Sequence, residues 1–348
     1  MKITIVLATC NGSAHLPEQL DSLLRQTHVP DMLIACDDAS TDDTLDHLRR
    51  IQKIAPFRVK IVARRDRVGP MANFLDGCSR QPNEWVAFCD QDDIWEPDKL
   101  SRCVAAAHVS GANMVIHSVS HFSVDGSGAR KGRGASSVPD RVVDGLKIAP
   151  IAIFLGMSMM LNRRILAQAS QLRDIWEGIF DEAVQSRPVC QLDHWSHAHD
   201  MFALMASRLA GKVAFISRPL AQHRLHDRNY SLVGSSWSQP QNVAEMWGSG
   251  TDADYRKLAA FCQDLVKALV SNAAADAMQE ERLNLVRDEF SRWIDIFNKR
   301  AVLARHDGSI TQRANALRCL ATQGAYRSRF DGGLGVASLA RDMSRVAF

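Results

Sequence analysis

Short apolar runs alternate with longer stretches of helical periodicity over the first third of the chain. The apolar runs predict strands, which we place at residues 3–8, 32–36, 59–63, 85–89 and 114–117. The periodic stretches between them predict helices at residues 16–26, 42–54, 71–78 and 97–110. This alternation is typical of βαβ units, so we predict an α/β fold with a mainly parallel sheet flanked by helices.

The pattern continues past a polar interruption. Residues 123–139 are rich in Gly, Ser, Arg and Lys, which indicates a hairpin or a mobile loop. A helix through residues 201–209 and a strand at 212–217 then extend the α/β part.

A linker-like stretch at residues 234–250 precedes two long helical patterns, at 253–269 and 278–305. We therefore predict an α/β domain over residues 1–240 and a helical C-terminal extension over residues 241–348. The arginines of its last part form either a basic face lying on anionic lipid or a solvated face packed on its own core. The second interpretation is favoured.

Composition narrows the class of protein. The 348 residues are 46% hydrophobic and 23% charged, as in ordinary globular proteins, and the net charge is only +3. So small an excess of positive charge does not call for a nucleic-acid partner, although it is compatible with an anionic ligand or membrane surface. The eight cysteines show no CxxC pair, which argues against a zinc site or a disulfide framework.

The chain opens directly into a strand-like run, without a basic and apolar leader, so secretion is not expected. The most apolar window, residues 148–161, is shorter than the roughly 20 residues that a membrane-spanning helix needs. We predict a cytoplasmic location.

Three carboxylates crowd the end of one predicted strand, at Asp90, Asp92 and Asp93. Their mutual repulsion would be costly without a compensating cation. Mg²⁺ or Mn²⁺ is held by one or two protein carboxylates together with substrate phosphates, so the cluster suits a diphosphate substrate. A plain turn, with Asp93 capping the next helix, explains the residues equally well.

Asp37 and Asp38 form a second acidic pair at the end of another strand. Thr41 or Asp42 nearby accounts for capping of the helix that follows. Capping does not explain two adjacent acids at the strand end, where ligands of open α/β sheets bind.

The order of these motifs resembles family 2 of the inverting glycosyltransferases, and within it a rhamnosyltransferase-like bacterial branch. The resemblance runs through residues 3–234 and rests on Asn11, Leu16, Leu20, Ser22-Leu23-Leu24, Gln26-Thr27, Asp37 to Asp42, Gly69, Asn73, Asp90 to Trp95, Pro97 and Lys99. It implies a GT-A (Rossmann-like) fold. It also implies a nucleotide-sugar site formed by Thr9, Asn11, Asp37, Asp38, Asp90 and Asp92, in which Asp92 is favoured as the ligand of Mn²⁺ or Mg²⁺.

The resemblance places the catalytic base at Asp200, in a His-Asp pair with His199. An inverting transfer is a single displacement in which a carboxylate takes the proton of the acceptor hydroxyl, and such a base contributes about 10²- to 10⁴-fold. The alternative is an N-cap for the helix that follows.

Further residues are implied around the two substrates. His226 would be a second metal or diphosphate contact, and Arg224 would neutralise the departing diphosphate. Gly156 would lie on the acceptor side, together with His199 and Trp95. Trp95 stacks on a sugar or packs against the sheet, and the sequence does not decide between these.

The expected activity is that of a metal-dependent hexosyltransferase in surface polysaccharide synthesis, such as O-antigen. dTDP-rhamnose is the favoured donor and a UDP-sugar the alternative, with a glycan or a lipid-linked glycan as acceptor and a peripheral position at the inner face of the membrane. A different class of protein, a catalytically silent scaffold that binds nucleotide sugars, is the other hypothesis, and slow hydrolysis of the donor would distinguish the two.

Overall fold

The computed structural model describes residues 1–125, 127–149, 152, 154–166, 199–226, 251–271, 277–305, 307–328, 333–334 and 336–347. These residues divide into two compact units. The first unit contains the described residues up to 142, then 154–166 and 199–226. The second contains residues 143–149 and 152 and the described residues after 250.

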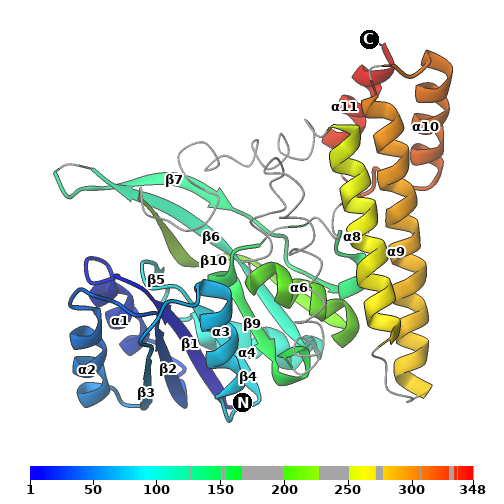
Figure 1. Ribbon diagram of the computed structural model, residues 1–348. Helices are drawn as coiled ribbons and strands as arrows, with labels where there is room; N and C mark the ends of the chain where they lie inside the picture. Colours follow the sequence, from blue (N-terminus) through cyan, green and yellow to red (C-terminus); the bar gives the residue numbers. More distant parts are fainter. Residues whose placement is uncertain are drawn as a thin grey trace. The chain divides into compact units, whose positions relative to one another are not determined.

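The first unit is built on one sheet, with strand order β3-β2-β1-β4-β9-β6-β10-β5 (Figure 1). Four strands run parallel at one end of it: β1 (Ile3–Thr9), β2 (Met32–Asp37), β3 (Arg58–Ala63) and β4 (Trp85–Cys89). Their apolar runs are buried on both faces at β1, β2 and β4, as is usual for parallel strands.

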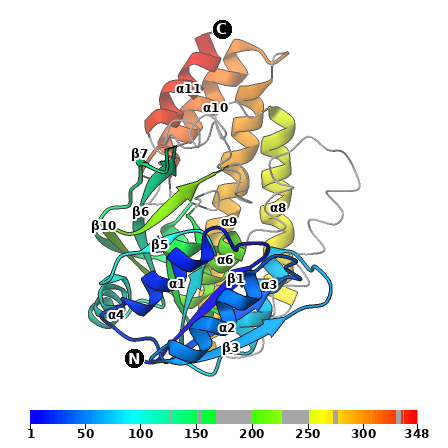
Figure 2. The same ribbon diagram turned by 90° about the vertical axis from the view of Figure 1, so that its left-hand side faces the viewer.

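The other half of the sheet is mixed. The short β9 (Met159–Asn162) lies antiparallel between β4 and β6 (Met114–Val124), and β10 (Lys212–Leu225) runs parallel to β6. β5 (Ile94–Trp95) pairs antiparallel with β10, and β7 (Arg130–Ser136) folds back on β6 (Figure 2). The polar segment 123–139 therefore contains a hairpin, and β8 (Arg141–Asp144) follows it in the chain.

Helices cover both faces of this sheet. α1 (Leu16–Leu24), α2 (Thr44–Ile54) and α4 (Lys99–Ser110) place their leucines and cysteine in one core cluster with alternate residues of β1, β2 and β4. α3 (Pro70–Ser79) and α6 (His199–Ala210) pack on the other face. The predicted α/β fold of GT-A type is confirmed, since its parallel strands and flanking helices are all present.

The second unit is helical, with α8 (Asp252–Ser271), α9 (Ala277–Ala304), α10 (Ile310–Thr322) and α11 (Val336–Ala347). Arg300 and Asp342 form an ion pair of 2.9 Å inside it, with side chains 1% and 0% exposed. The Tyr326 hydroxyl donates to the same carboxylate at 3.0 Å, and the Arg300 guanidinium lies 4.7 Å from the centre of the Tyr255 ring. A C-terminal helical part is thus confirmed.

The predicted boundary at residue 240 lies outside the described residues and stays a prediction. Over the described ranges, no helix combines the length and the apolar character that crossing a membrane requires.

Candidate active site

The carboxyl ends of β1, β2 and β4 meet at one edge of the sheet. Thr9 pairs in register with Asp37, and Leu7 pairs with Cys89, the residue before Asp90. Parallel pairing alone therefore brings the two predicted acidic clusters to the same edge, where open α/β sheets bind ligands.

Asp37 is fully buried and joins two of these strand ends. Its carboxylate accepts hydrogen bonds from the Thr9 hydroxyl at 2.9 Å, from the Ser40 backbone N–H at 3.0 Å and from the Ser40 hydroxyl at 2.5 Å. The Asn11 N–H in turn donates to Ser40 Oγ at 2.8 Å. Asp37, Thr9 and Asn11 thus form one hydrogen-bonded group through Ser40.

Two residues of this group have left-handed backbone conformations, Asn11 with φ 49° and Ala39 with φ 56°. Asparagine tolerates this region, whereas alanine adopts it at an energetic cost. Such strain persists where the surrounding contacts fix the backbone, and it is often found at functional sites.

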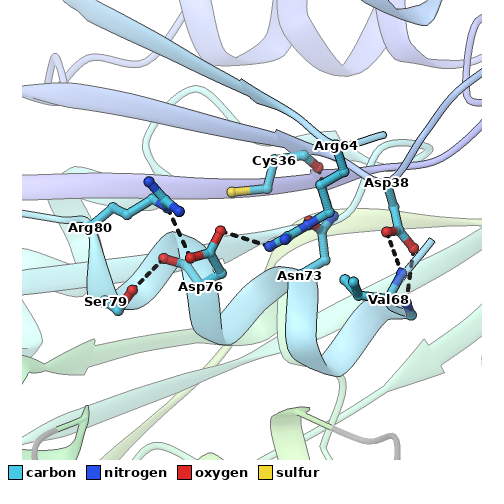
Figure 3. Close-up of polar contacts among 9 residues, drawn as sticks. Cys36, Asp38, Arg64, Val68, Asn73, Asp76, Ser79 and Arg80 are labelled. Carbon is cyan, nitrogen blue, oxygen red and sulfur yellow. Dashed lines mark hydrogen bonds and ion pairs between the residues drawn. The ribbon is translucent and has the colours of Figure 1, made fainter. Parts of the chain in front are cut away.

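Asp38 holds the loop that follows β3 (Figure 3). Its carboxylate accepts from the N–H groups of Val68 and Gly69, at 2.8 and 3.0 Å. The other end of this loop is fixed by Arg64, which donates to Asn73 Oδ1 at 3.0 Å and to Asp76 at 2.6 Å. Contacts of Asp37 and Asp38 with a base remain predictions, because both carboxylates serve the fold in this conformation.

The structure adds Gln91, a residue that sequence reasoning left without a role. Its side-chain amide accepts from Cys10 N–H at 2.8 Å and donates to Cys10 C=O at 3.2 Å, which ties the acidic loop to the end of β1. Gly12 leaves room for it, because a Cβ at Gly12 would lie 2.2 Å from Gln91 Oε1. Two features of the sequence could have indicated this contact: Gly12 in the turn between the first strand and the first helix, and the amide Gln91 between two acids.

The acidic loop carries more negative charge than its surroundings favour. Burial, assisted by the charges of Asp92 and Asp200, raises the pKa of Asp90 to about 7. Burial also raises the pKa of Asp93, which is 1% exposed, well above its ordinary value. The sequence argument that these carboxylates need a cation is therefore supported by their environment.

Lys99 supplies part of the compensating positive charge, since it acts on both Asp90 and Asp93. Its buried ammonium group donates to Met157 C=O at 2.5 Å and lies 3.4 Å from the centre of the Trp95 ring. Burial lowers the pKa of Lys99 to about 8, while the nearby thiols and carboxylates oppose this shift. Trp95 itself is 2% exposed, so its predicted contact with a sugar has no accessible ring face in this conformation and stays a prediction.

The two predicted metal ligands lie together. His226 Nε2 is 2.9 Å from Asp92 Oδ2, although the residues are 134 positions apart in the chain. Among the residues that the structure describes, no group of three or more His, Cys, Asp or Glu side chains could hold a metal ion. A pair of ligands still fits Mg²⁺ or Mn²⁺, which takes its remaining ligands from substrate phosphates and water.

Arg224 closes this side of the loop. Its backbone N–H donates to Asp93 Oδ1 at 3.2 Å and its Nε to the Asp92 carbonyl oxygen at 3.0 Å. Its side chain is 5% exposed and also pairs with Glu18 of α1. The guanidinium therefore lies directly beside the predicted metal ligands.

Asp200, in the first turn of α6, is half-buried and close enough for its charge to act on Asp90. The structure thus brings the predicted base to the acidic loop. The helix predicted through residues 201–209 is present as part of α6.

His199 lies beside Gly156, as the predicted acceptor-side group requires. Its ring stacks on Phe74 at 3.8 Å and meets the edge of Phe88 at 4.9 Å, and its Nε2 has no hydrogen-bond partner among the described residues. A Cβ at Gly156 would lie 2.3 Å from this Nε2, so only glycine fits there. Burial lowers the pKa of His199 to about 3, and its ring is neutral at physiological pH.

Comparison with known proteins finds similar glycosyltransferases. Residues 4–169 match the sequence profile of glycosyl transferase family 2. An uncharacterized glycosyltransferase of Nostoc sp. is 26% identical over 252 residues, which cover 71% of this chain and 72% of that protein. The dTDP-rhamnosyl transferase RfbG of Shigella flexneri is 31% identical over 111 residues, or 31% of this chain and 38% of RfbG.

Among solved structures, S. aureus TarS 1-349 in complex with UDP-GlcNAc is similar with a TM-score of 0.51 at 14% identity, covering 99% of this chain and 91% of that one. This likeness supports the fold.

Proposed function

On the premise that residues 4–169 match the profile of glycosyl transferase family 2, we propose that this protein transfers a sugar from a nucleoside diphosphate donor to a glycan acceptor, with inversion at the anomeric carbon. The observation that carries the proposal is the meeting of Asp92, His226 and Arg224 at one sheet edge, with Asp200 beside the same loop. Segments far apart in the sequence thus bring together groups that would neutralise a diphosphate leaving group and a carboxylate that would act as general base.

In this proposal Asp92 and His226 would hold Mn²⁺ or Mg²⁺, and the bound ion would supply positive charge opposite the donor diphosphate. Arg224 acts on the same oxygens through its guanidinium. Asp200 accepts the proton of the acceptor hydroxyl as that oxygen forms a bond to the anomeric carbon. The bond from this carbon to the diphosphate oxygen breaks, and the electron pair leaves with the nucleoside diphosphate.

Thr9, Asn11, Asp37, Asp38 and Asp90 shape the nucleotide side of the proposed site. Gly156, His199 and Trp95 belong to its acceptor side. The neutral, buried ring of His199 would shape this side rather than exchange protons.

The donor class is supported by the ligands and names of similar proteins. TarS was solved with UDP-GlcNAc, and RfbG is named as a dTDP-rhamnosyl transferase. Another relative, ExoO of Rhizobium meliloti, is named for succinoglycan biosynthesis. We therefore propose dTDP-rhamnose or a UDP-sugar as donor, and a glycan or lipid-linked glycan of a surface polysaccharide as acceptor, reached at the inner face of the cytoplasmic membrane.

The test is release of nucleoside diphosphate from dTDP-rhamnose, UDP-glucose, UDP-GlcNAc and GDP-mannose by the purified chain, in Mn²⁺, Mg²⁺ or EDTA. We expect metal-dependent release from one donor class. Asp200→Asn should bind that donor as the unmodified protein does and lose about 10²- to 10⁴-fold in turnover. Donor binding without any release, in either protein, would favour the silent scaffold.

A further inference from the structure

One carboxylate at the edge of the site is shared by two arginines from different strands. Glu18, in the first turn of α1, pairs through Oε1 with Arg130 of β7 and through Oε2 with Arg224 of β10. Two guanidinium groups thus face a single negative charge, and each presents a fork that suits phosphate as well as carboxylate.

The two arginines also contact the same aromatic ring, that of Phe122. The guanidinium carbons of Arg224 and Arg130 lie 4.7 and 5.1 Å from the centre of the Phe122 ring. Phe122 is 5% exposed and belongs to β6, the strand that pairs with both β7 and β10. The positions of the arginines therefore rest on this sheet and do not depend on Glu18 alone.

Arg224 links Glu18 to the loop that carries the proposed metal pair. Arg224 donates through Nε to the carbonyl oxygen of Asp92, whose side chain meets His226 at 2.9 Å. The His15 ring, at the start of α1, lies 4.7 Å from the His226 ring. Arg224 thus contacts both Glu18 and the backbone of Asp92, a member of the proposed metal pair.

The exposure of the three side chains argues against a purely structural pairing. Glu18 and Arg130 are 42% and 45% exposed, and ion pairs between side chains this open to water contribute little to stability. Arg224, at 5% exposed, is the deeply placed cation of the group. An exposed carboxylate on a buried arginine can be exchanged for another anion without unfolding the sheet.

We propose that Arg130 and Arg224 together form a two-arginine site for the donor's diphosphate, and that Glu18 occupies this site while no donor is bound. Arg130 thereby becomes a further binding residue, and Glu18 a competing anion built into the chain. The inference rests on the proposed function, because it names the groups that receive the diphosphate of that same donor.

The test is isothermal titration of the full chain with inorganic pyrophosphate, UDP and dTDP in Mg²⁺. Glu18→Gln removes the competing charge and should tighten pyrophosphate binding about two- to fivefold. Arg130→Gln removes one charge-assisted contact and should weaken it roughly tenfold. Arg133→Gln, on the same hairpin but donating to Ser123 Oγ rather than to Glu18, is the matched control and should leave binding unchanged.

A structural role for Glu18 predicts the opposite sign, so unchanged or weaker binding by Glu18→Gln would overturn the inference, as would unchanged binding by Arg130→Gln. Pyrophosphate that still binds the arginines when UDP is saturating would assign them to a different diphosphate, such as that of a lipid-linked acceptor, and would also overturn it. Wild-type protein that binds neither nucleotide and releases none would instead contradict the proposed function.

Discussion

The buried ring of His199 shows how one side chain can make stability depend on pH. In the unfolded chain a histidine has a pKa near 6.5, whereas burial between Phe74 and Phe88 lowers the pKa of His199 to about 3. Between these two values the unfolded state binds the proton and the folded state does not. The contribution of His199 to the free energy of unfolding is therefore complete above pH 6.5 and is lost progressively as the pH falls toward 3.

We expect the free energy of unfolding to fall by about 2 kcal/mol from this group between pH 7 and pH 5. His199→Leu should flatten that part of the profile, since leucine binds no proton. Urea unfolding at a series of pH values measures the slope. His108→Leu, at an exposed position of α4, is the control; an equal change of slope in both variants would show that His199 is not the group responsible.

We expect metal-dependent nucleotide binding to require Asp92. Asp92→Ala removes one of only two protein ligands in the proposed pair with His226. We expect the rise in melting temperature that UDP or dTDP causes in Mn²⁺ to disappear, because ligand binding to the native state is what raises it. A shift equal to that of the unmodified protein would place the metal elsewhere.

Sequence reasoning assigned candidate roles where a cluster followed a strand, and it assigned none where a residue makes its contact across the fold. Asp92 and His226 were paired through the resemblance, and the structure brings them together. Gln91 and Glu18 were not predicted to act, because a single amide or an exposed glutamate is unremarkable in a sequence. Their partners, Cys10 and Arg224, lie 81 and 206 positions away.

Among the elements, α3 packs closely on the sheet at Gly77. A Cβ on Gly77 would lie 2.5 Å from Val6 Cγ1 of β1 and 3.0 Å from Cys36 Sγ of β2. α3 also carries Asn73, whose amide donates to the Cys36 carbonyl oxygen at 2.7 Å (Figure 3). Close packing here holds α3 against β1 and the end of β2, next to the proposed nucleotide side of the site.

Gly77→Ala should therefore cost about 1–3 kcal/mol in stability, because the helix must move away from two strands that cannot yield. Donor affinity should fall as well, since Asn73 and the Arg64 loop move with the helix. Denaturant unfolding and nucleotide titration measure the two effects. Gly132→Ala, in β7 with open space around the added carbon, should do neither, and equal losses in both variants would contradict the argument.

Element by element, the parallel strands and the helices between them were predicted because each has a continuous period of its own. β5 was not, since two residues are too short for a pattern, and its pairing with β10 makes it a strand. β9, with four residues, is likewise held by its pairing with β4 and β6. The same pairing extends β6 to Val124 and β10 to Leu225, beyond their apolar runs.

At the scale of the whole molecule, the second unit contains a buried ion pair among its packed helices. Arg300 and Asp342, on α9 and α11, are paired and almost without exposure. Removing one partner of such a pair leaves the other charge buried and uncompensated, at a typical cost of 3–5 kcal/mol.

We expect Asp342→Ala to lower the thermal stability of the helical unit strongly, as followed by circular dichroism at 222 nm. The double variant Arg300→Met with Asp342→Leu should recover much of the loss, because it removes both charges. A double variant no more stable than the single one would show that Tyr326 and the packing around it, rather than the uncompensated charge, dominate.

The order in which the chain is made has a consequence for the pair between Asp92 and His226. Synthesis delivers β1 to β4 first, and their local βαβ contacts can form as they emerge. A further 134 residues must follow Asp92 before its histidine partner exists. The nascent protein therefore carries an unpaired Asp92 while 134 of its 348 residues are made, and the pair with His226 cannot form until β10 has taken its place in the sheet.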